Sequence, residues 1–369
     1  MFVSIVIFIL VLSILILVHE FGHFIVAKKS GIMVEEFGIG LPPRLIGKKI
    51  GETIYSINWL PFGGFNRMHG EQDEEGITDV SKSFLHKSKK TRALVIVAGV
   101  IMNFLLAIVC FAIVYSFTGI MRETGKAMVV SVSPDSPALT SGIIVGDQIL
   151  SIDGKTVTKS DEVTSLVTTH GGTHNLVVET GPAQNRVQKK ITVNTKLDPQ
   201  SGNYYMGIVL TSAENYFPPI WQRPFYGIYY GFKDAVYWGE TIILGLWSLV
   251  VEIFKGQTIQ GVSGPIGIFA VTTEAAKSGI LTVINFVGIL SVNLAILNIL
   301  PFPALDGGRL LFIGIEAVTG RKTSFKVEGT INQIGMMILL ALILVITIGD
   351  IRRLITFKGI QGFINSMGK

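Results

Sequence analysis

The sequence predicts a polytopic α-helical membrane protein with about four transmembrane helices, a membrane-associated β-hairpin region and an inserted β-rich domain. Of its 369 residues, 49% are hydrophobic and 15% are charged, whereas soluble domains carry about 25% charged residues. Four apolar runs are long enough to cross a bilayer, and a segment of short β-branched stretches separates the second run from the third. The single cysteine, Cys110, excludes an internal disulfide.

The four apolar runs define the expected spans. They are residues 1–27, 93–118, 281–308 (which ends in a proline-rich segment) and 334–350. The first is expected to be a retained helix rather than a signal peptide, because no Lys or Arg precedes it and no small-residue cleavage site follows it. Within residues 213–280, the stretch Ala235–Phe254 is interrupted by Glu240 and Glu252. We expect it to lie in the membrane interface as an amphipathic helix, with a fifth span as the alternative.

The distribution of positive charge predicts the orientation. Residues 28–92 contain 11 Lys and Arg, whereas the much longer segment 119–280 contains 12. Because Lys and Arg concentrate in cytoplasmic loops, we expect 28–92 and the loop 309–333 to be cytoplasmic. The middle domain and the tail 351–369 then lie outside. The net charge of +5 favours contact with lipid headgroups, and the absence of a basic stripe interleaved with aromatic residues excludes nucleic-acid binding.

Two regions are predicted to form β-structure. The cytoplasmic segment has glycine-punctuated, strand-like pieces such as Lys49–Ile57, and its two histidines, His69 and His86, are expected on the solvated surface. The domain at 127–212 is expected to turn at Asp153-Gly154 and at Gly171-Gly172. Its predicted strands are Met128–Val132, Gln148–Ile152, Asn175–Glu179, Gln188–Val193 and Tyr205–Leu210.

The first apolar run contains the sequence His19-Glu20-Phe21-Gly22-His23, an HExxH motif. Positions i and i+4 lie on one face of a helix, so His19 and His23 can bind one zinc ion, and Glu20 can take a proton from zinc-bound water. Three ionisable residues in an apolar helix are costly unless they are paired or functional. The alternative is that they only mark a helix end at the headgroups, where Lys or Arg is more usual.

Two histidines leave a zinc site short of a ligand, and Asp306 is the outstanding candidate for the third. It follows the third apolar run directly, after Pro301 and Pro303, which break the helix. Gly307 and Gly308 allow close approach of the backbone. Broken backbone at membrane depth is tolerated only beside protein or a wet cavity. The alternative is an ordinary helix-ending turn in which the aspartate is only a cap.

The motifs together resemble the site-2 protease family of intramembrane metalloproteases, in its RseP-type bacterial branch. The resemblance covers nearly the whole chain. Besides HExxH it rests on Asn298-x-x-Pro301-x-Pro303-x-Leu305-Asp306-Gly307, on Ala98–Phe104 in the second span and on Gly264–Gly267 before the third. The middle domain resembles a single PDZ domain of that family, through Ser136-Pro137-Ala138 and the run from Gly142 to Gly154.

The resemblance implies roles for matching positions. His19, His23 and Asp306 would hold Zn²⁺, Glu20 would be the catalytic base, and Asn298 would contact the scissile backbone or the oxyanion. Residues Val34–Met68 would form a membrane-reentrant β-hairpin that binds substrate as an added strand, in agreement with the need to unwind a helical substrate.

The implied function is that of an intramembrane zinc endopeptidase in a bacterial cytoplasmic (inner) membrane, with its active site near the cytoplasmic side and its PDZ domain outside. Its substrates would be single-span membrane proteins already trimmed outside, such as anti-sigma factors or remnant signal peptides.

Two other functions remain open from the sequence. One is a membrane-anchored zincin that acts on cytosolic or misfolded proteins, with Glu240 or Glu252 as its third ligand. The other is a non-catalytic adaptor that binds partners through its PDZ domain. An adaptor is expected to have lost Glu20 or a zinc ligand, and none is missing.

Overall fold

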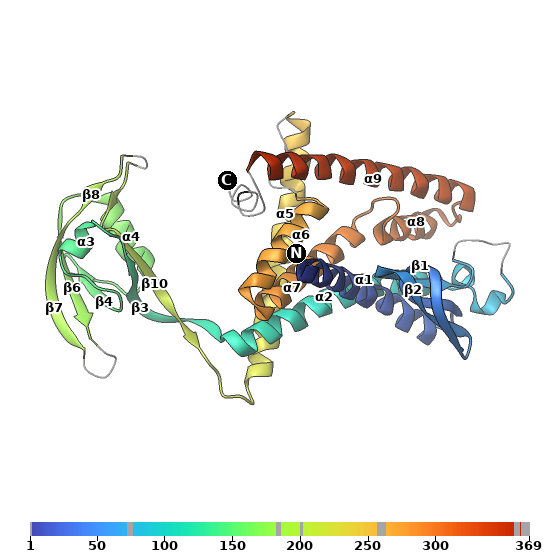
Figure 1. Cartoon of the computed structure of the whole chain (residues 1–369), viewed down its shortest axis with the longest axis horizontal. Helices are drawn as coiled ribbons and strands as arrows, with labels where there is room; N and C mark the ends of the chain where they lie inside the picture. Colours follow the sequence, from blue (N-terminus) through green and yellow to red (C-terminus); the bar gives the residue numbers. More distant parts are fainter. Residues whose placement is uncertain are drawn as a thin grey trace. The chain divides into compact units, whose positions relative to one another are not determined.

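The computed structural model describes residues 2–71, 77–181, 186–199, 202–256, 263–357 and 362. The chain forms two compact units, one made of Met1–Phe117 with Ile220–Lys369 and one made of Thr118–Pro219 (Figure 1). The second unit encloses the domain expected at 127–212. Parts of the segment 213–280 (257–262) and of the tail 351–369 (358–361 and 363–369) lie outside the described residues.

In the described part of the chain, five helices are long and apolar enough to cross a membrane. They are α1 (Phe2–Lys29), α2 (Lys89–Thr118), α5 (Arg223–Phe254), α7 (Ile280–Ile299) and α9 (Phe325–Thr356). Helices α1, α2 and α9 cover the expected spans 1–27 (from Phe2), 93–118 and 334–350, and α7 covers 281–299 of the span expected at 281–308. The fifth, α5, is the least apolar and contains the stretch Ala235–Phe254.

The helices of the first unit pack through small residues and aliphatic clusters. A Cβ atom on Gly22 of α1 would lie 2.4 Å from the carbonyl oxygen of Ala98 in α2, so the two helices cross with their backbones in contact. Beside this crossing, Val11 and Leu15 of α1 pack with Val287 of α7. The HExxH face of α1 is therefore held against the middle of α2.

The segment after α1 is a twisted hairpin of β1 (Val34–Ile50) and β2 (Thr53–Met68). Residues 34–39 pair on one side with 64–68 and on the other with 54–57, and 44–50 pair with 53–58. The segment 64–68 is thus an edge: within the described residues its strand pairing is with β1 alone. The expected strand-like piece Lys49–Ile57 is wrong as a single strand, because Gly51, at φ +64°, turns the chain inside it.

The hairpin lies along the apolar first helix. Ser13 Oγ donates a hydrogen bond of 3.1 Å to the carbonyl oxygen of Pro61. Gly63 and Gly64 lie against the Ile16 and Leu17 side chains. The end of β2 therefore continues from these residues toward the HExxH turn of α1.

The segment 309–333, expected as a cytoplasmic loop between the last two spans, is mostly helical, and its cytoplasmic location stays a prediction. Helix α8 covers Asp306–Thr319 and α9 begins at Phe325. Leu310 and Ile313 of α8 pack against the cluster of Ala27, Val95 and their neighbours, and Gly320 ends the helix in the left-handed conformation. The amphipathic packing of α8 overrides the loop-like charge pattern. Short turns, η1 (Val80–Lys82) and η2 (Phe84–His86), precede α2.

Helix α6 (Pro265–Ser278) begins at the glycine-proline motif before the third span. Asp350 of α9 is 1% exposed, and its Oδ2 atom accepts hydrogen bonds from the backbone N–H groups of Gly264 at 2.9 Å and Gly267 at 3.0 Å. A carboxylate at a helix N-terminus compensates the unpaired amides and the helix dipole. The motif is therefore the docking point of α6 on α9.

In the described part of the second unit, a six-stranded antiparallel sheet packs with two helices. Its core contains Ile143, Ile149, Ile152, Leu176 and Val178. The main path of the sheet runs β10-β3-β4-β6-β7, with β5 on β4, and β8 and β9 form a separate small ladder. The strands are β3 (Ile120–Val132), β4 (Gln148–Ile152), β5 (Lys155–Thr156), β6 (Thr173–Thr180), β7 (Val187–Asn194), β8 (Lys196–Leu197), β9 (Tyr204–Tyr205) and β10 (Ile208–Tyr216), and the helices are α3 (Pro137–Thr140) and α4 (Ser160–Thr169).

The expected strands lie within these elements, with one exception. The stretch Tyr205–Leu210 is broken at Gly207, which has a φ of +79°. Positive φ at Asp153 and Gly154 forms the expected turn between β4 and β5.

The expected surface position of His69 is wrong. Its side chain is 2% exposed, Nδ1 donates to Glu35 Oε1 at 2.8 Å, and Nε2 accepts from the backbone N–H of Thr78 at 3.1 Å. The ring joins the hairpin to the segment after it, a contact between distant residues that composition does not reveal. His86 is exposed, as expected.

Candidate metal centre

Three of the residues singled out from the sequence converge inside the first unit. His19 and His23 are buried on one face of α1, and Asp306 is the first residue of α8. Asp306 Oδ2 lies 3.0 Å from His19 Nε2 and 3.2 Å from His23 Nε2, and the two Nε2 atoms are 3.1 Å apart. In a tetrahedral zinc site, ligand atoms about 2.0–2.1 Å from the metal are about 3.3 Å from one another. The three donors therefore have the chemistry and the spacing of a zinc site.

The second nitrogen of His23 is fixed by the backbone of α2. His23 Nδ1 donates to the carbonyl oxygen of Val95 at 2.8 Å. This hydrogen bond keeps the proton on Nδ1 and leaves the lone pair of Nε2 free, which is the arrangement that metal-binding histidines use.

Gly99 makes room for both imidazoles. A Cβ atom at this position would lie 2.6 Å from His23 Nε2 and 2.7 Å from His19 Cε1. These separations are shorter than real side-chain contacts, so only glycine fits here. The second-span motif thus supplies the space that the two rings occupy.

Asp306 is placed by the proline-rich turn after α7. Ala304 adopts a left-handed φ of +75°, and its N–H donates to Asn332 Oδ1 of α9 at 3.2 Å. The start of α8 packs directly on the turn, since a Cβ atom on Gly307 would lie 2.0 Å from the carbonyl oxygen of Leu300. Glycine at that position therefore lets the carboxylate reach the histidines.

The expected catalytic residues lie at the same place. Glu20 lines a cavity of about 230 Å³ together with His23 and Asp306. Asn298 of α7 has its amide nitrogen 3.4 Å from His19 Nε2. Glu240 and Glu252, the alternative ligands, are not part of the His19, His23 and Asp306 cluster found among the described residues.

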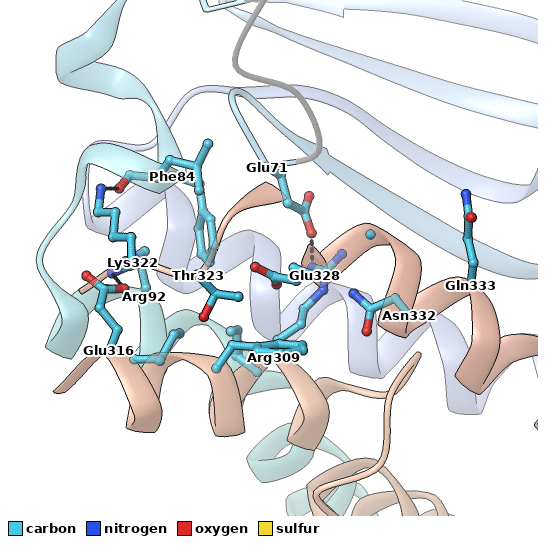
Figure 2. Close-up of a pocket in the computed structure, with 15 residues that line it drawn as sticks. Glu71, Phe84, Arg92, Arg309, Glu316, Lys322, Thr323, Glu328, Asn332 and Gln333 are labelled. Atoms are coloured by element: carbon cyan, nitrogen blue, oxygen red, sulfur yellow. Dashed lines mark hydrogen bonds and ion pairs between the residues drawn. The ribbon is translucent and has the colours of Figure 1, made fainter. Parts of the chain in front are cut away.

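A larger cavity of about 420 Å³ adjoins the first, and Glu71, Ile96 and Arg309 line both. Figure 2 shows the larger cavity, with the Glu71–Arg309 ion pair at its wall and Glu328 and Asn332 facing it from α9. Arg309 is three residues from Asp306, on the same helix. The ion pair thus lies between the metal cluster and the larger cavity.

Sequence reasoning missed three residues of this region. Asn103 contacts His19, Asn66 of β2 lines the smaller cavity, and Arg309 pairs with Glu71. For Asn103 the available signal is its place in the second-span stretch Ala98–Phe104, on which the family resemblance rests. Asn66 and Arg309 carry no signal in a single sequence.

Known proteins match almost the whole chain. The family model of peptidase family M50 matches residues 7–342. A putative zinc metalloprotease of Clostridium perfringens is 40% identical over 345 residues, covering 93% of this chain and 96% of the relative. Another of Clostridium acetobutylicum is 35% identical over 351 residues (95% and 98%), and the zinc metalloprotease RasP of Geobacillus kaustophilus is 29% identical over 426 residues (95% and 98%).

Among solved structures, the PDZ domain of an SdrC-like protein from Listeria monocytogenes is 23% identical, covers 26% of this chain and 88% of its own, and has a TM-score of 0.21. The match over residues 7–342 and the 40% identical relative, whose length is almost completely covered, agree with the motifs of the first helix and of the proline-rich turn. The chain belongs to peptidase family M50, the site-2 protease family.

Proposed function

We propose that this protein is an intramembrane zinc endopeptidase that cleaves the transmembrane segments of single-span membrane proteins after their ectodomains have been removed. The observation that carries the proposal is the convergence of His19, His23 and Asp306 within a bundle of long apolar helices. Ionisable residues at such a position are functional by default. The names of the relatives, which are zinc metalloproteases, support zinc as the metal.

His19, His23 and Asp306 would hold the zinc ion, through two Nε2 atoms and Oδ2. A zinc ion in such a site supplies Lewis acidity, which polarises a carbonyl group and lowers the pKa of water. The chain itself contributes the fixed tautomer of His23 and the space at Gly99. Both keep the donor atoms oriented before substrate arrives.

Glu20 would act as the general base. It is the neighbour of His19 on α1 and lines the cavity of about 230 Å³ that His23 and Asp306 also line. From there its carboxylate takes a proton from the attacking water and delivers it to the leaving amine nitrogen. Asn298, beside His19, would donate its amide N–H to the oxygen that becomes negative during attack.

A helical substrate hides its peptide groups in its own hydrogen bonds, so it must be unwound before cleavage. The edge segment 64–68 of β2 ends beside the metal cavity, where Phe65 and Met68 are among the lining residues. An exposed strand edge can bind an unwound peptide by β-augmentation. This supports the hairpin as the element that presents the substrate backbone to Glu20.

The contacts of the first unit support four spans, with α5 in the interface. Glu328 of α9 and Arg92 of α2 line the same cavity, so these two helices start on one side of the membrane. Gly227 near the start of α5 packs on Ala112 near the far end of α2, and Gly264 binds Asp350 near the far end of α9. Residues 227–264 therefore begin and end on one side. The connection from Phe254 to Gly264 is too short for a second transmembrane helix, which takes about 20 residues.

The distribution of Lys and Arg supports an extracytoplasmic location for that side. The bacterial sources of the relatives support the cytoplasmic membrane of a bacterium. The metal cluster then lies nearer the cytoplasmic side, and the domain at 127–212 lies outside the cell membrane. The alternative zincin loses support because its expected ligands, Glu240 and Glu252, are not part of the metal cluster. The adaptor loses support because all ligands and Glu20 are present.

The test is cleavage of a tagged single-span protein, with its ectodomain already removed, in membranes that contain the wild type or Glu20→Gln. Zinc content is measured on both purified proteins. We expect the wild type to cleave and Glu20→Gln to keep zinc without cleaving. Equal cleavage by both would show that the activity belongs to another protein. Zinc binding without cleavage by the wild type, across several trimmed single-span proteins, would favour the adaptor.

A further inference from the structure

One polar side chain in the metal cavity, that of Asn66, has no hydrogen-bond partner among the described residues. Asn66 lies in the edge segment 64–68 of β2 and lines the cavity that also contains Glu20, His23 and Asp306. Its Nδ2 and Oδ1 atoms are both buried, and neither has a hydrogen-bond partner among the described residues. A complete carboxamide is therefore buried unpaired beside the proposed reaction site.

Such a burial is unfavourable for folding. An unpaired buried polar group loses its hydrogen bonds to water without replacement, and most buried polar atoms in proteins are paired. Asn58 of the same hairpin is partly paired: its Nδ2 donates to the carbonyl oxygens of Ile39 and Gly40, both at 3.2 Å, and only its Oδ1 is buried without a partner among the described residues. Asn66 instead keeps a donor and an acceptor free.

The position of Asn66 indicates which partner can form hydrogen bonds with its side chain. Asn66 and Met68 are two residues apart, so their side chains lie on the same face of the strand, and both line the cavity. The Asn66 backbone already pairs with Phe37 of β1. Asn66 therefore lines the cavity that an unwound substrate must enter to reach Glu20.

We propose that the Asn66 carboxamide hydrogen-bonds to a main-chain peptide group of the bound substrate. This inference rests on the proposed function. A carboxamide offers one acceptor and N–H donors, which complements the N–H and C=O of a peptide group and carries no charge. The contact is independent of substrate side chains, so it holds the backbone of many sequences in the extended conformation.

The experiment measures binding without cleavage. The full chain with Glu20→Gln is placed in lipid nanodiscs with a fluorescently labelled peptide that contains one apolar segment of about 20 residues. Asn66→Leu in this background removes both polar atoms at similar volume. We expect it to bind the peptide about tenfold more weakly, the effect of losing one or two uncharged hydrogen bonds.

Replacing single peptide bonds of the probe by esters locates the contact. One ester position should weaken binding to the Asn66 protein and have no effect on the Asn66→Leu protein, which is the signature of a direct contact. The melting temperature separates this role from a structural one. Asn66→Leu should leave it unchanged or raised, whereas Asn58→Leu, the matched control, should lower it.

The outcomes distinguish the inference from the proposed function. If Glu20→Gln alone does not bind the peptide, the proposed function fails. If the Glu20→Gln protein binds the peptide and the Asn66→Leu variant in this background binds it equally well, the Asn66 amide makes no hydrogen bond to the substrate. The inference is then overturned. A lowered melting temperature with no ester-specific effect would assign Asn66 to the fold and also overturn it.

Discussion

Asn103 of α2 lies against the imidazole of His19, with its amide nitrogen 3.3 Å from Nδ1, while its own Oδ1 is buried without a hydrogen-bond partner among the described residues. A rotation of the carboxamide by 180° exchanges its two atoms. Oδ1 then accepts the Nδ1–H of His19, and Nε2 of His19 is free for a metal. Asn103 would thus do for His19 what the carbonyl of Val95 does for His23.

This relationship predicts that Asn103→Leu weakens zinc binding about tenfold to hundredfold, because the orienting hydrogen bond of one ligand is lost. Asn103→Asp keeps a hydrogen-bond acceptor, so its zinc affinity should remain near that of the wild type. Competition of the purified proteins with a zinc-chelating dye measures the difference. Equal affinities of the leucine and aspartate variants would assign Asn103 to packing alone.

Gly99→Ala should reduce zinc affinity by about tenfold or more, since its Cβ would lie within 2.7 Å of both imidazole rings and displace them. The fold should survive, because alanine favours helix more than glycine does. The matched control is Gly314→Ala in α8, where a Cβ atom meets nothing within 4 Å. The same metal competition is used, and loss of zinc by both variants would contradict the steric explanation.

Asp350→Ala should lower the stability of the first unit by about 2–4 kcal/mol, because it leaves the N–H groups of Gly264 and Gly267 buried and unpaired at the start of α6. Asp350→Asn keeps an accepting oxygen and should lower the stability less. The melting temperatures of the two variants in detergent measure the difference. Thr347→Ala, which removes only a hydrogen bond within α9, is the control. If Asp350→Ala has the same melting temperature as the Thr347→Ala control, the contact of the Asp350 carboxylate with the start of α6 does not stabilise the unit.

The β-rich unit should show a pH dependence at Asp153. The backbone N–H of Asn175 donates to Oδ1 at 2.8 Å and, with His174, holds the pKa of the Asp153 carboxyl below its usual value. A lowered pKa in the folded state contributes stability above the unfolded value and loses it as the pH falls through the folded one. Protection of the Asn175 amide from hydrogen exchange, corrected for intrinsic rates, should therefore fall below about pH 4.

Asp153→Asn is the comparison for this titration. It should show reduced protection of the Asn175 amide at neutral pH and no further loss on acidification. Identical pH profiles of the variant and the wild type would place the origin of the effect elsewhere in the unit.

The sequence by itself determined the local chemistry of this protein. HExxH in an apolar run fixes His19, Glu20 and His23 on one helical turn, because helical periodicity needs no tertiary information. Asp306 could be identified from the sequence for a similar reason, because prolines and glycines after an apolar run indicate a broken helix. The β-rich domain was predicted from β-branched stretches and turn residues in the same local way, whereas the hairpin at Val34–Met68 was implied by the family resemblance.

Only the tertiary structure decided which residues support that chemistry. The contacts of Asn103, Gly99 and Val95 with the histidines join positions far apart in the chain, and a single sequence does not encode their distance. The burial of His69 and the helix α8 likewise arise from packing that overrides local polarity. Asn66 is the clearest case, because an amide without a partner among the described residues is recognisable only from the positions of its neighbours.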